Sequence, residues 1–317
     1  MKRFLLVYVC LVLLATACGG GAAPTESAPS SPGPVAPAST PTQSMPFDVS
    51  KLGTIESDVR YCTIEGVDLY MDVYYPEAMD GEWPAVVYVH GGAWMGGDKT
   101  SGAGYRELPE LVSRGYLAIS VNYRLAPDYA FPAMIEDVKC AIRHLRAHAG
   151  EYNIDPQRIG AWGSSAGGHL VSLLGVTDRE QGFDQTGQYL DQSSRVMAVA
   201  DLFGPADLTL ATDAPRIRQA VFGTADPSAV ILATASPVTY VTADDPPFLI
   251  LHGDQDDVVP PEHSERLYAR LTEAGVPVVF VLVENAGHGF ARVDGAINPS
   301  RDQITGMIAD FFDQHLK

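Results

Sequence analysis

Six nearly continuous apolar runs of six to eight residues recur along the chain and limit the folds open to it. A strand that is buried on both faces of a sheet is apolar throughout, whereas a strand with one solvated face alternates. Helical patterns, with apolar residues three or four positions apart, lie between several of the runs. Strands that alternate with helices predict an α/β fold with a mostly parallel sheet and helices on both faces. The runs are 84–89, 116–121, 158–163, 196–203, 247–252 and 278–283.

Two shorter alternating stretches, 59–65 and 67–75, precede these runs and predict a hairpin around Gly66. With them the expected sheet has eight strands. Functional sites of such sheets gather at the carboxyl ends of the parallel strands, so we look for chemistry in the loops that follow the runs. The expected helices carry their apolar faces on Ile135, Val138, Ile142 and Leu145, on Leu267, Leu271 and Ala274, and on Ile304, Ile308, Phe311 and Phe312.

The first 45 residues differ in composition from the rest. Two basic residues, an apolar run too short to span a bilayer and a few small residues predict a signal peptide over 1–17. Its end, "ATAC", resembles the lipobox of bacterial lipoproteins, which implies lipidation of Cys18. Residues 18–45 are almost wholly Gly, Ala, Pro, Ser and Thr and predict a disordered tether. We expect an exported protein, lipid-anchored to the outer face of a cell membrane; an ordinary cleaved signal is the alternative.

Residues 46–317 have the length of one large α/β domain and contain no further linker-like segment. The whole chain has a formal charge of −18, and removal of Lys2 and Arg3 with the leader makes it −20. A field of this sign repels polyanions, so we expect no nucleic-acid partner. Two cysteines, Cys62 and Cys140, remain in the domain. Export would permit a disulfide, but two cysteines in a domain of this size are more often separate buried thiols.

Ser165 lies between an apolar run and an expected helix, in the sequence Gly163-Ser164-Ser165-Ala166-Gly167. A Gly-x-Ser-x-Gly at a strand-to-helix turn is the nucleophile elbow, where side chains two residues from the serine would collide. The helix that follows points its first N–H groups and the positive end of its dipole at anything bound to the serine. A flexible glycine-rich turn is the alternative reading.

A serine hydroxyl becomes a good nucleophile only beside a positioned base. His288 lies in "NAGHGF", a loop of small residues directly after the last apolar run, from which an imidazole can reach Ser165. Five other histidines lie on expected helices or at a strand end: His144, His148, His169, His252 and His315. We therefore expect His288 to be the base.

Three aspartates, Asp254, Asp256 and Asp257, follow the run 247–252 and can orient that base. The chain order Ser, Asp, His is that of the α/β-hydrolases. Acidic loops of this kind also bind calcium, but this one lacks the loop glycine and the distal glutamate of such a site. We expect neither a metal nor a cofactor.

The glycines of "YVHGGAW", which follow the run 84–89, offer backbone donors for a developing oxyanion. The amides of Gly91 and Gly92 can approach a substrate without a side chain in the way, and they pair naturally with the amide of Ala166. His90 resembles a metal ligand, yet beside these glycines it is better placed to brace the loop through hydrogen bonds.

Five motifs resemble the bacterial α/β-hydrolase esterases related to hormone-sensitive lipase and to the feruloyl-esterase-like group. They are "HGGAW", "VNYRLAPDYAFPAMIEDV", "GSSAGG", "HGDQDDVVP" and "NAGHGF", and the resemblance covers about 60–315. It implies an α/β-hydrolase catalytic domain over 46–317. The departure of "HGGAW" from His-Gly-Gly-Gly places the chain nearer the feruloyl-esterase-like and arylformamidase-like branches. The implied roles are Ser165 as nucleophile, Asp256 as triad acid, His288 as base, and Gly91 and Gly92 in the oxyanion hole.

The segment 204–246 is the one sizeable insertion, and its mixed, polar composition differs from that of an apolar lid. We expect an open, shallow cleft in which Trp94 and Tyr123 offer flat faces to an aromatic or sugar group. Such a cleft suits short acyl esters (acetyl to butyryl) and feruloyl-type esters, either as small molecules or linked to polysaccharides. An arylformamidase, a serine peptidase of the prolyl-oligopeptidase type and a non-catalytic binding lipoprotein on a hydrolase scaffold are the alternatives.

Overall fold

The computed structural model describes residues 52–77, 81–210 and 214–317. The expected signal peptide (1–17), Cys18 and the expected tether (18–45) lie outside these ranges. Within the described ranges, no helix has the length and apolar character needed to cross a membrane.

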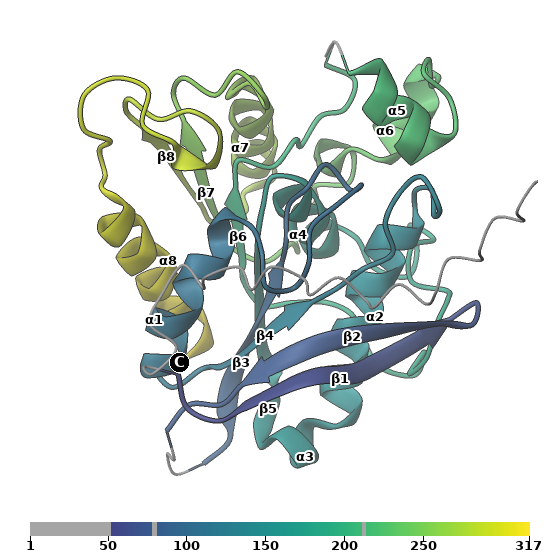
Figure 1. Ribbon diagram of the computed structural model, residues 1–317, viewed down its shortest axis with the longest axis vertical. Helices are drawn as coiled ribbons and strands as arrows, with labels where there is room; N and C mark the ends of the chain where they lie inside the picture. The colour runs from purple at the N-terminus through teal and green to yellow at the C-terminus, as the bar shows by residue number, and fades with distance from the viewer. Residues whose placement is uncertain (1–51, 78–80, 211–213) are drawn as a thin grey trace, which may run out of the picture. The chain divides into compact units, whose positions relative to one another are not determined.

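An eight-stranded sheet forms the centre of the domain, in the order β1-β2-β4-β3-β5-β6-β7-β8 (Figure 1). Strand β2 pairs antiparallel with both of its neighbours, and all the other pairs are parallel. All eight expected strands are present, so the predicted α/β-hydrolase sheet is confirmed. The strands are β1 (Ile55–Ile64), β2 (Val67–Tyr74), β3 (Trp83–Val89), β4 (Leu117–Val121), β5 (Ile154–Ser164), β6 (Val199–Leu202), β7 (Phe248–Gly253) and β8 (Val278–Val283).

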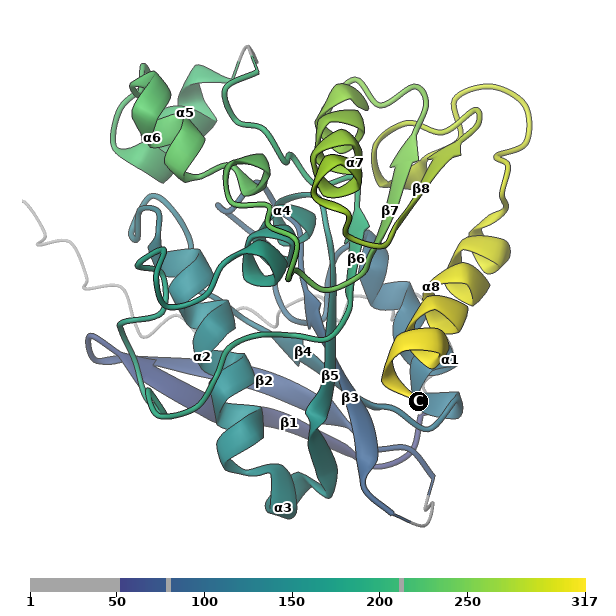
Figure 2. The same ribbon diagram turned by 180° about the vertical axis from the view of Figure 1, so that it is seen from behind.

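Helices cover both faces of this sheet, as Figures 1 and 2 show from opposite sides. One buried cluster joins the sheet to α2, α4 and α7, and a second joins its other face to α1 and α8. The helices are α1 (Leu108–Ser113), α2 (Ala133–Ala147), α3 (Ala149–Tyr152), α4 (Ala166–Val176), α5 (Pro215–Phe222), α6 (Ala229–Thr234), α7 (Glu262–Ala274) and α8 (Arg301–Leu316), with 3₁₀ turns η2 (Ala103–Glu107), η3 (Pro237–Thr239) and η4 (His288–Phe290).

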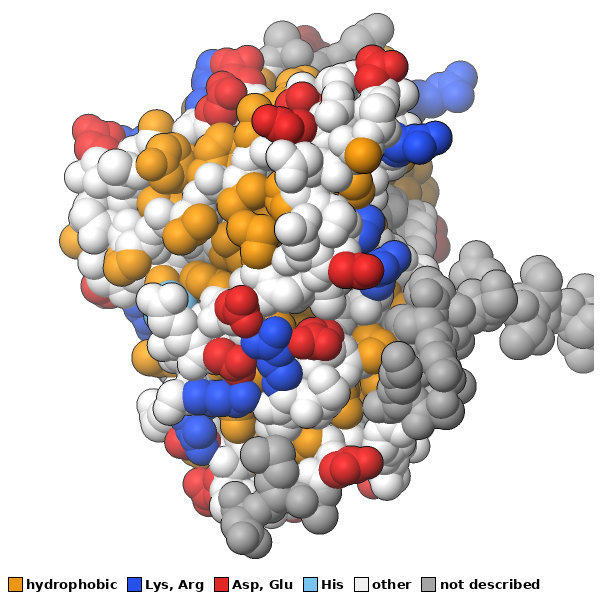
Figure 3. All heavy atoms as spheres, turned by 90° about the vertical axis from the view of Figure 1, so that its left-hand side faces the viewer, with side chains coloured by type: hydrophobic (Ala, Val, Ile, Leu, Met, Phe, Trp, Pro, Cys, Tyr) orange, Lys and Arg blue, Asp and Glu red, His pale blue; other side chains and the backbone are white. Residues whose placement is uncertain are grey.

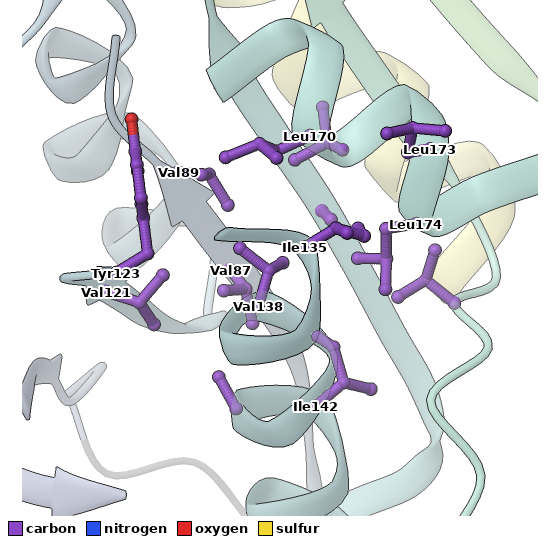
Figure 4. Close-up of a cluster of buried hydrophobic side chains, with 14 of the residues drawn as sticks. Val87, Val89, Val121, Tyr123, Ile135, Val138, Ile142, Leu170, Leu173 and Leu174 are labelled. Carbon is purple, nitrogen blue, oxygen red and sulfur yellow. The ribbon is translucent and has the colours of Figure 1, made fainter. Parts of the chain in front are cut away.

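The apolar face predicted for residues 135–145 packs on the sheet as expected (Figure 4). Ile135, Val138 and Ile142 of α2 are fully buried, beside valines of β3 and β4 and leucines of α4. Burial of one such side chain stabilises the fold by about 1.5–3 kcal/mol. This packing holds α4, and with it the turn that carries Ser165, against the carboxyl ends of the strands.

Strand β8 is the outer strand of the sheet on the side that Figure 3 faces. Apolar side chains gather on the upper part of that surface, and Val279 and Leu282 are exposed residues of β8. Acidic and basic side chains lie together lower on the same face. An ion pair between Arg114 and Asp310 joins the end of α1 to α8.

Cys62 in β1 and Cys140 in α2 form a disulfide, so the expectation of separate thiols is wrong. The cause lies in the packing: α2 crosses the β1–β2 hairpin, which brings together two cysteines that are 78 positions apart. Gly187 fits directly over the bridge, since a Cβ there would lie 3.0 Å from the Cys140 sulfur. Sequence spacing alone carries no information on this contact.

Candidate active site

Ser165 sits at a sharp turn between β5, which ends at Ser164, and α4, which begins at Ala166. Its φ of 55° and ψ of −120° are strained values for a residue with a side chain. A Cβ added at Gly163 would overlap the carbonyl oxygen of Gly167, and one added at Gly167 would overlap that of Val89. The two flanking glycines are therefore required by close backbone packing, as a nucleophile elbow demands.

The structure brings the three predicted catalytic side chains together. The Oγ atom of Ser165 lies 3.0 Å from Nε2 of His288, and Nδ1 of His288 lies 2.7 Å from Oδ2 of Asp256. His288 begins the η4 turn after β8, and Asp256 lies in the loop after β7. The hydroxyl, imidazole and carboxylate thus form one hydrogen-bonded row at the carboxyl ends of neighbouring strands. This row has the geometry of a nucleophile, a general base and an orienting acid.

Of the three aspartates in the β7 loop, only Asp256 reaches the imidazole among the described contacts. Asp254 instead accepts a hydrogen bond from the backbone N–H of Ala286, and it ties two loops together. Asp257 is exposed. The other oxygen of Asp256 accepts the N–H groups of Val258 and Val259, each at 2.9 Å.

His252 is a second histidine beside the Asp256 carboxylate, and it faces the same oxygen as His288. Its Nε2 lies 2.8 Å from the carbonyl oxygen of Val259 and 3.4 Å from Asp256, so this nitrogen carries the proton. The Ser264 hydroxyl donates to Nδ1 at 2.6 Å. Burial by itself would raise the pKa of Asp256, but the hydrogen bonds from His252 and His288 hold it well below its usual value. Asp256 therefore stays ionised. From the sequence, His252 was expected only at the end of a strand, and its contact with the triad acid was missed.

The backbone donors expected for the oxyanion lie close to the serine. A Cβ at Gly91 would lie 3.3 Å from that of Ser165, so this loop passes directly beside the nucleophile. Ala166 lines a pocket with Ser165, and so does Ala93, which follows Gly92 and has a φ of 54°. Ala93 was not singled out from the sequence, where only its position directly after the glycine pair indicates that it lies near the serine. Gly91 and Ala93 thus lie near the reacting atom, with Gly92 between them in the chain.

His90 braces this loop, as expected. Its Nδ1 lies 2.7 Å from the carbonyl oxygen of Gly91, and its ring stacks on that of Tyr123 with the ring centres 4.3 Å apart. The Tyr123 hydroxyl donates to the carbonyl of His90 at 3.0 Å. Tyr123 is consequently buried and does not line the pocket, so its predicted role as a flat substrate-binding face is wrong. The tyrosine supports the glycine loop instead.

Trp94 does line the pocket beside Ser165, with 9% of its surface exposed. Its indole N–H donates to Nδ1 of His169 at 3.2 Å, and Nε2 of His169 donates to the carbonyl of Ala235 at 2.7 Å. Burial lowers the pKa of His169 to about 4, so the ring is neutral and its Nδ1 can accept a hydrogen bond from the indole N–H. The indole is therefore held at a fixed angle.

The insertion 204–246 turns an apolar side toward the site, in contrast to the open, shallow cleft that its composition suggested. The exposed residues of helix α5 are mostly polar, whereas α6 also exposes Val230 and Ile231. Both helices contribute apolar residues to the pocket. The resulting pocket has a volume of about 120 Å³. It is therefore small beside the roughly 300–1,000 Å³ of pockets that hold drug-sized ligands. Apolar lining residues from this insertion are Pro205, Leu208, Leu210, Ala214, Ile217, Phe222 and Leu232.

No group of three or more His, Cys, Asp or Glu side chains is arranged to hold a metal ion in the part of the chain that the structure describes. The sheet order and the row from serine to aspartate define the class: the domain is an α/β-hydrolase. Residues 71–271 match the family model BD-FAE, and the chain belongs to the BD-FAE family.

The relatives agree with this assignment. The chain is 34% identical over 221 residues to esterase LipC of Mycobacterium tuberculosis, a match that covers 67% of this chain and 54% of LipC. It is 33% identical over 239 residues to the probable carboxylic ester hydrolase LipM of the same organism, over 72% of this chain and 54% of LipM. The chain thus spans about half the length of the curated relatives it matches.

Solved structures show the same architecture. A truncated carbohydrate esterase from gut microbiota superposes with a TM-score of 0.72 at 31% identity, over 83% of this chain and 96% of that one. A thermophilic esterase from Thermogutta terrifontis, with propionate bound, superposes with a TM-score of 0.68 at 26% identity, over 86% and 97% of the two chains.

The loop geometry predicts a ranking among the aspartates. Asp256→Asn should lower kcat on 4-nitrophenyl acetate by about 1,000- to 10,000-fold, because the amide holds His288 in the wrong tautomer. Asp257→Asn, which makes the same chemical change one residue away at an exposed position, should cost less than about threefold. Steady-state kinetics with circular dichroism as a folding check measures both. A larger loss from Asp254→Asn or Asp257→Asn would assign the acid to another residue.

Proposed function

We propose that the protein is a serine carboxylic-ester hydrolase that works through Ser165, His288 and Asp256 and an acyl-enzyme intermediate. The observation that carries this proposal is the hydrogen-bonded row of 3.0 Å and 2.7 Å that ends at Ser165 on the floor of the pocket. The names of the relatives as esterases and carboxylic ester hydrolases support it.

The geometry assigns a chemical role to each of the three side chains. Asp256 accepts a hydrogen bond from the Nδ1–H group of His288, which fixes the tautomer in which the lone pair of Nε2 faces the Ser165 hydroxyl. Nε2 takes the serine proton as Oγ attacks the ester carbonyl, and it returns that proton to the departing alcohol. A water molecule, activated by the same nitrogen, then attacks the acyl-enzyme and releases the acid.

The negative oxygen of each tetrahedral intermediate would be bound by the amide of Ala166 and by amides of the 91–93 loop. Ala166 is the first residue of α4, so its N–H is free of the helix ladder and the helix dipole adds positive potential there. Gly91 and Gly92 let the loop approach without side chains. Removal of one such donor costs about 100- to 1,000-fold in rate in serine hydrolases.

Short acyl esters are the proposed substrates, including acetyl or feruloyl-type groups linked to polysaccharides. The helices α5 and α6 close one end of the pocket and limit the acyl chain that fits, whereas Trp94 offers an indole edge near the serine. Among the structural neighbours, one is named a carbohydrate esterase, and the Thermogutta terrifontis esterase has propionate in one structure and butyrate in another.

We further propose that the enzyme acts outside the cytoplasm, anchored through a lipid on Cys18. The leader composition and the "ATAC" sequence support this location. The Cys62–Cys140 disulfide adds support of a different kind, since structural disulfides form and persist in oxidising compartments.

Acyl-chain length tests the proposed substrate class. With 4-nitrophenyl esters from acetate to dodecanoate, kcat/KM should be highest at two to four carbons, because a longer chain meets α5 and α6. Values that keep rising beyond about eight carbons would contradict a short-acyl pocket, since each methylene held in an apolar site adds transition-state binding.

The anchor has its own test in the native host. Cys18→Ala should move the protein from the membrane fraction to the soluble fraction, because the lipid is attached to that sulfur. Cys10→Ala changes the other cysteine of the leader and should leave the protein with the membrane. Immunoblots of separated fractions measure the distribution; equal partition of native protein and Cys18→Ala would refute the lipoprotein proposal.

A further inference from the structure

Arg218 on α5 lines the same pocket as Ser165. The chain as a whole is acidic, with 39 Asp and Glu against 21 Lys and Arg. Yet among the described residues that line this pocket there is no Asp or Glu, and Arg218 is the one cation. The wall between Arg218 and the serine is largely apolar. A positive charge at the end of an apolar pocket has no role in the hydrolytic steps described above.

The guanidinium group of Arg218 has no partner within the described ranges. Its Nε–H group is buried and finds no protein acceptor within hydrogen-bond distance, whereas the guanidinium group of Arg124, for example, pairs with the buried carboxylate of Asp137. A buried N–H group without an acceptor is costly, and the cost is greater when the group is charged. A negative charge bound beside the guanidinium group would offset part of this cost.

His263 provides a second donor in the same pocket wall. The backbone N–H of Asp207 donates to its Nδ1 at 3.2 Å, so the proton of the neutral ring is on Nε2. Burial lowers the pKa of His263 to about 4, which keeps the ring neutral at pH 7. No protein acceptor for Nε2 is present in the described part of the chain. The Asp207 carboxylate is already bound by Arg266 at 2.7 Å and by Thr209.

We propose that Arg218, assisted by the Nε2–H of His263, binds a carboxylate carried by the ester substrate. The preferred substrates are then short esters with a negative charge, on either the acyl or the alcohol part, rather than neutral esters of equal length. A guanidinium group binds a carboxylate through two parallel hydrogen bonds, which a neutral chain end cannot accept. This inference rests on the proposed esterase function and names the substrate class of that site.

Two pairs of esters separate the sources of the carboxylate. For the acyl side, 4-nitrophenyl hydrogen adipate is compared with 4-nitrophenyl hexanoate; for the alcohol side, 3-acetoxybenzoate is compared with phenyl acetate. Arg218→Gln should lower the ratio of kcat/KM for the charged to the neutral ester by roughly 10- to 100-fold in one of the pairs, mainly through KM. Ratios of variant to wild type cancel differences in intrinsic reactivity.

Arg216→Gln is the matched control, because Arg216 is exposed on the same helix and does not line the pocket. It removes the same charge and should leave both ratios within about twofold of wild type. Arg218→Lys keeps the charge but not the paired donors, and it should retain part of the preference, which guards against a folding defect in Arg218→Gln.

Four results would overturn the inference. Equal loss on charged and neutral esters in both pairs would make Arg218 a structural residue. An equal effect of Arg216→Gln would show that the preference for charged esters comes from long-range electrostatics and not from a contact with Arg218. Hydrolysis of the neutral esters with no preference in the wild type would reject the carboxylate site while leaving the esterase function intact, whereas hydrolysis of none of the four would reject both.

Discussion

The close contact of three backbone segments around Ser165 is the constraint on which the site depends. Gly163 and Gly167 allow β5 and α4 to meet at an angle that no side chain would permit, and Gly167 lies under the carbonyl of Val89 at the end of β3. The nucleophile and the 91–93 loop are thereby held relative to each other before any substrate arrives. His288 and Asp256 reach the same point because β7 and β8 end in register on the same sheet.

The fold was open to prediction because its sheet is buried on both faces. Continuous apolar runs mark such strands, and each expected run became a strand within a few residues of its predicted ends. Contacts between distant elements leave no comparable mark. Cys62 and Cys140 show this, because their pairing depends on how α2 crosses a hairpin. The sequences of α5 and α6 likewise do not reveal which apolar residues line the pocket and which, such as Val230, are exposed.

The candidate site was predictable to a similar extent and for related reasons. Ser165 and His288 stand out through small neighbours and position after a strand, whereas the choice of Asp256 over its neighbours came from family resemblance. Tyr123 was misplaced because an aromatic near a glycine loop can face either substrate or protein, and here it stacks on His90. Donors such as His263 carry no local signal, since the segments around its pocket come from distant parts of the chain.

The central claim is that Ser165 is the activated nucleophile of an esterase rather than a remnant on a binding scaffold. Intact-protein mass spectrometry after treatment with a fluorophosphonate tests this claim most directly, with peptide mapping to locate the adduct. The account predicts one phosphonyl adduct per chain, on Ser165, which disappears in Ser165→Ala and is greatly slowed in His288→Ala. An unlabelled folded protein, or an adduct on the neighbouring buried Ser164, would contradict it.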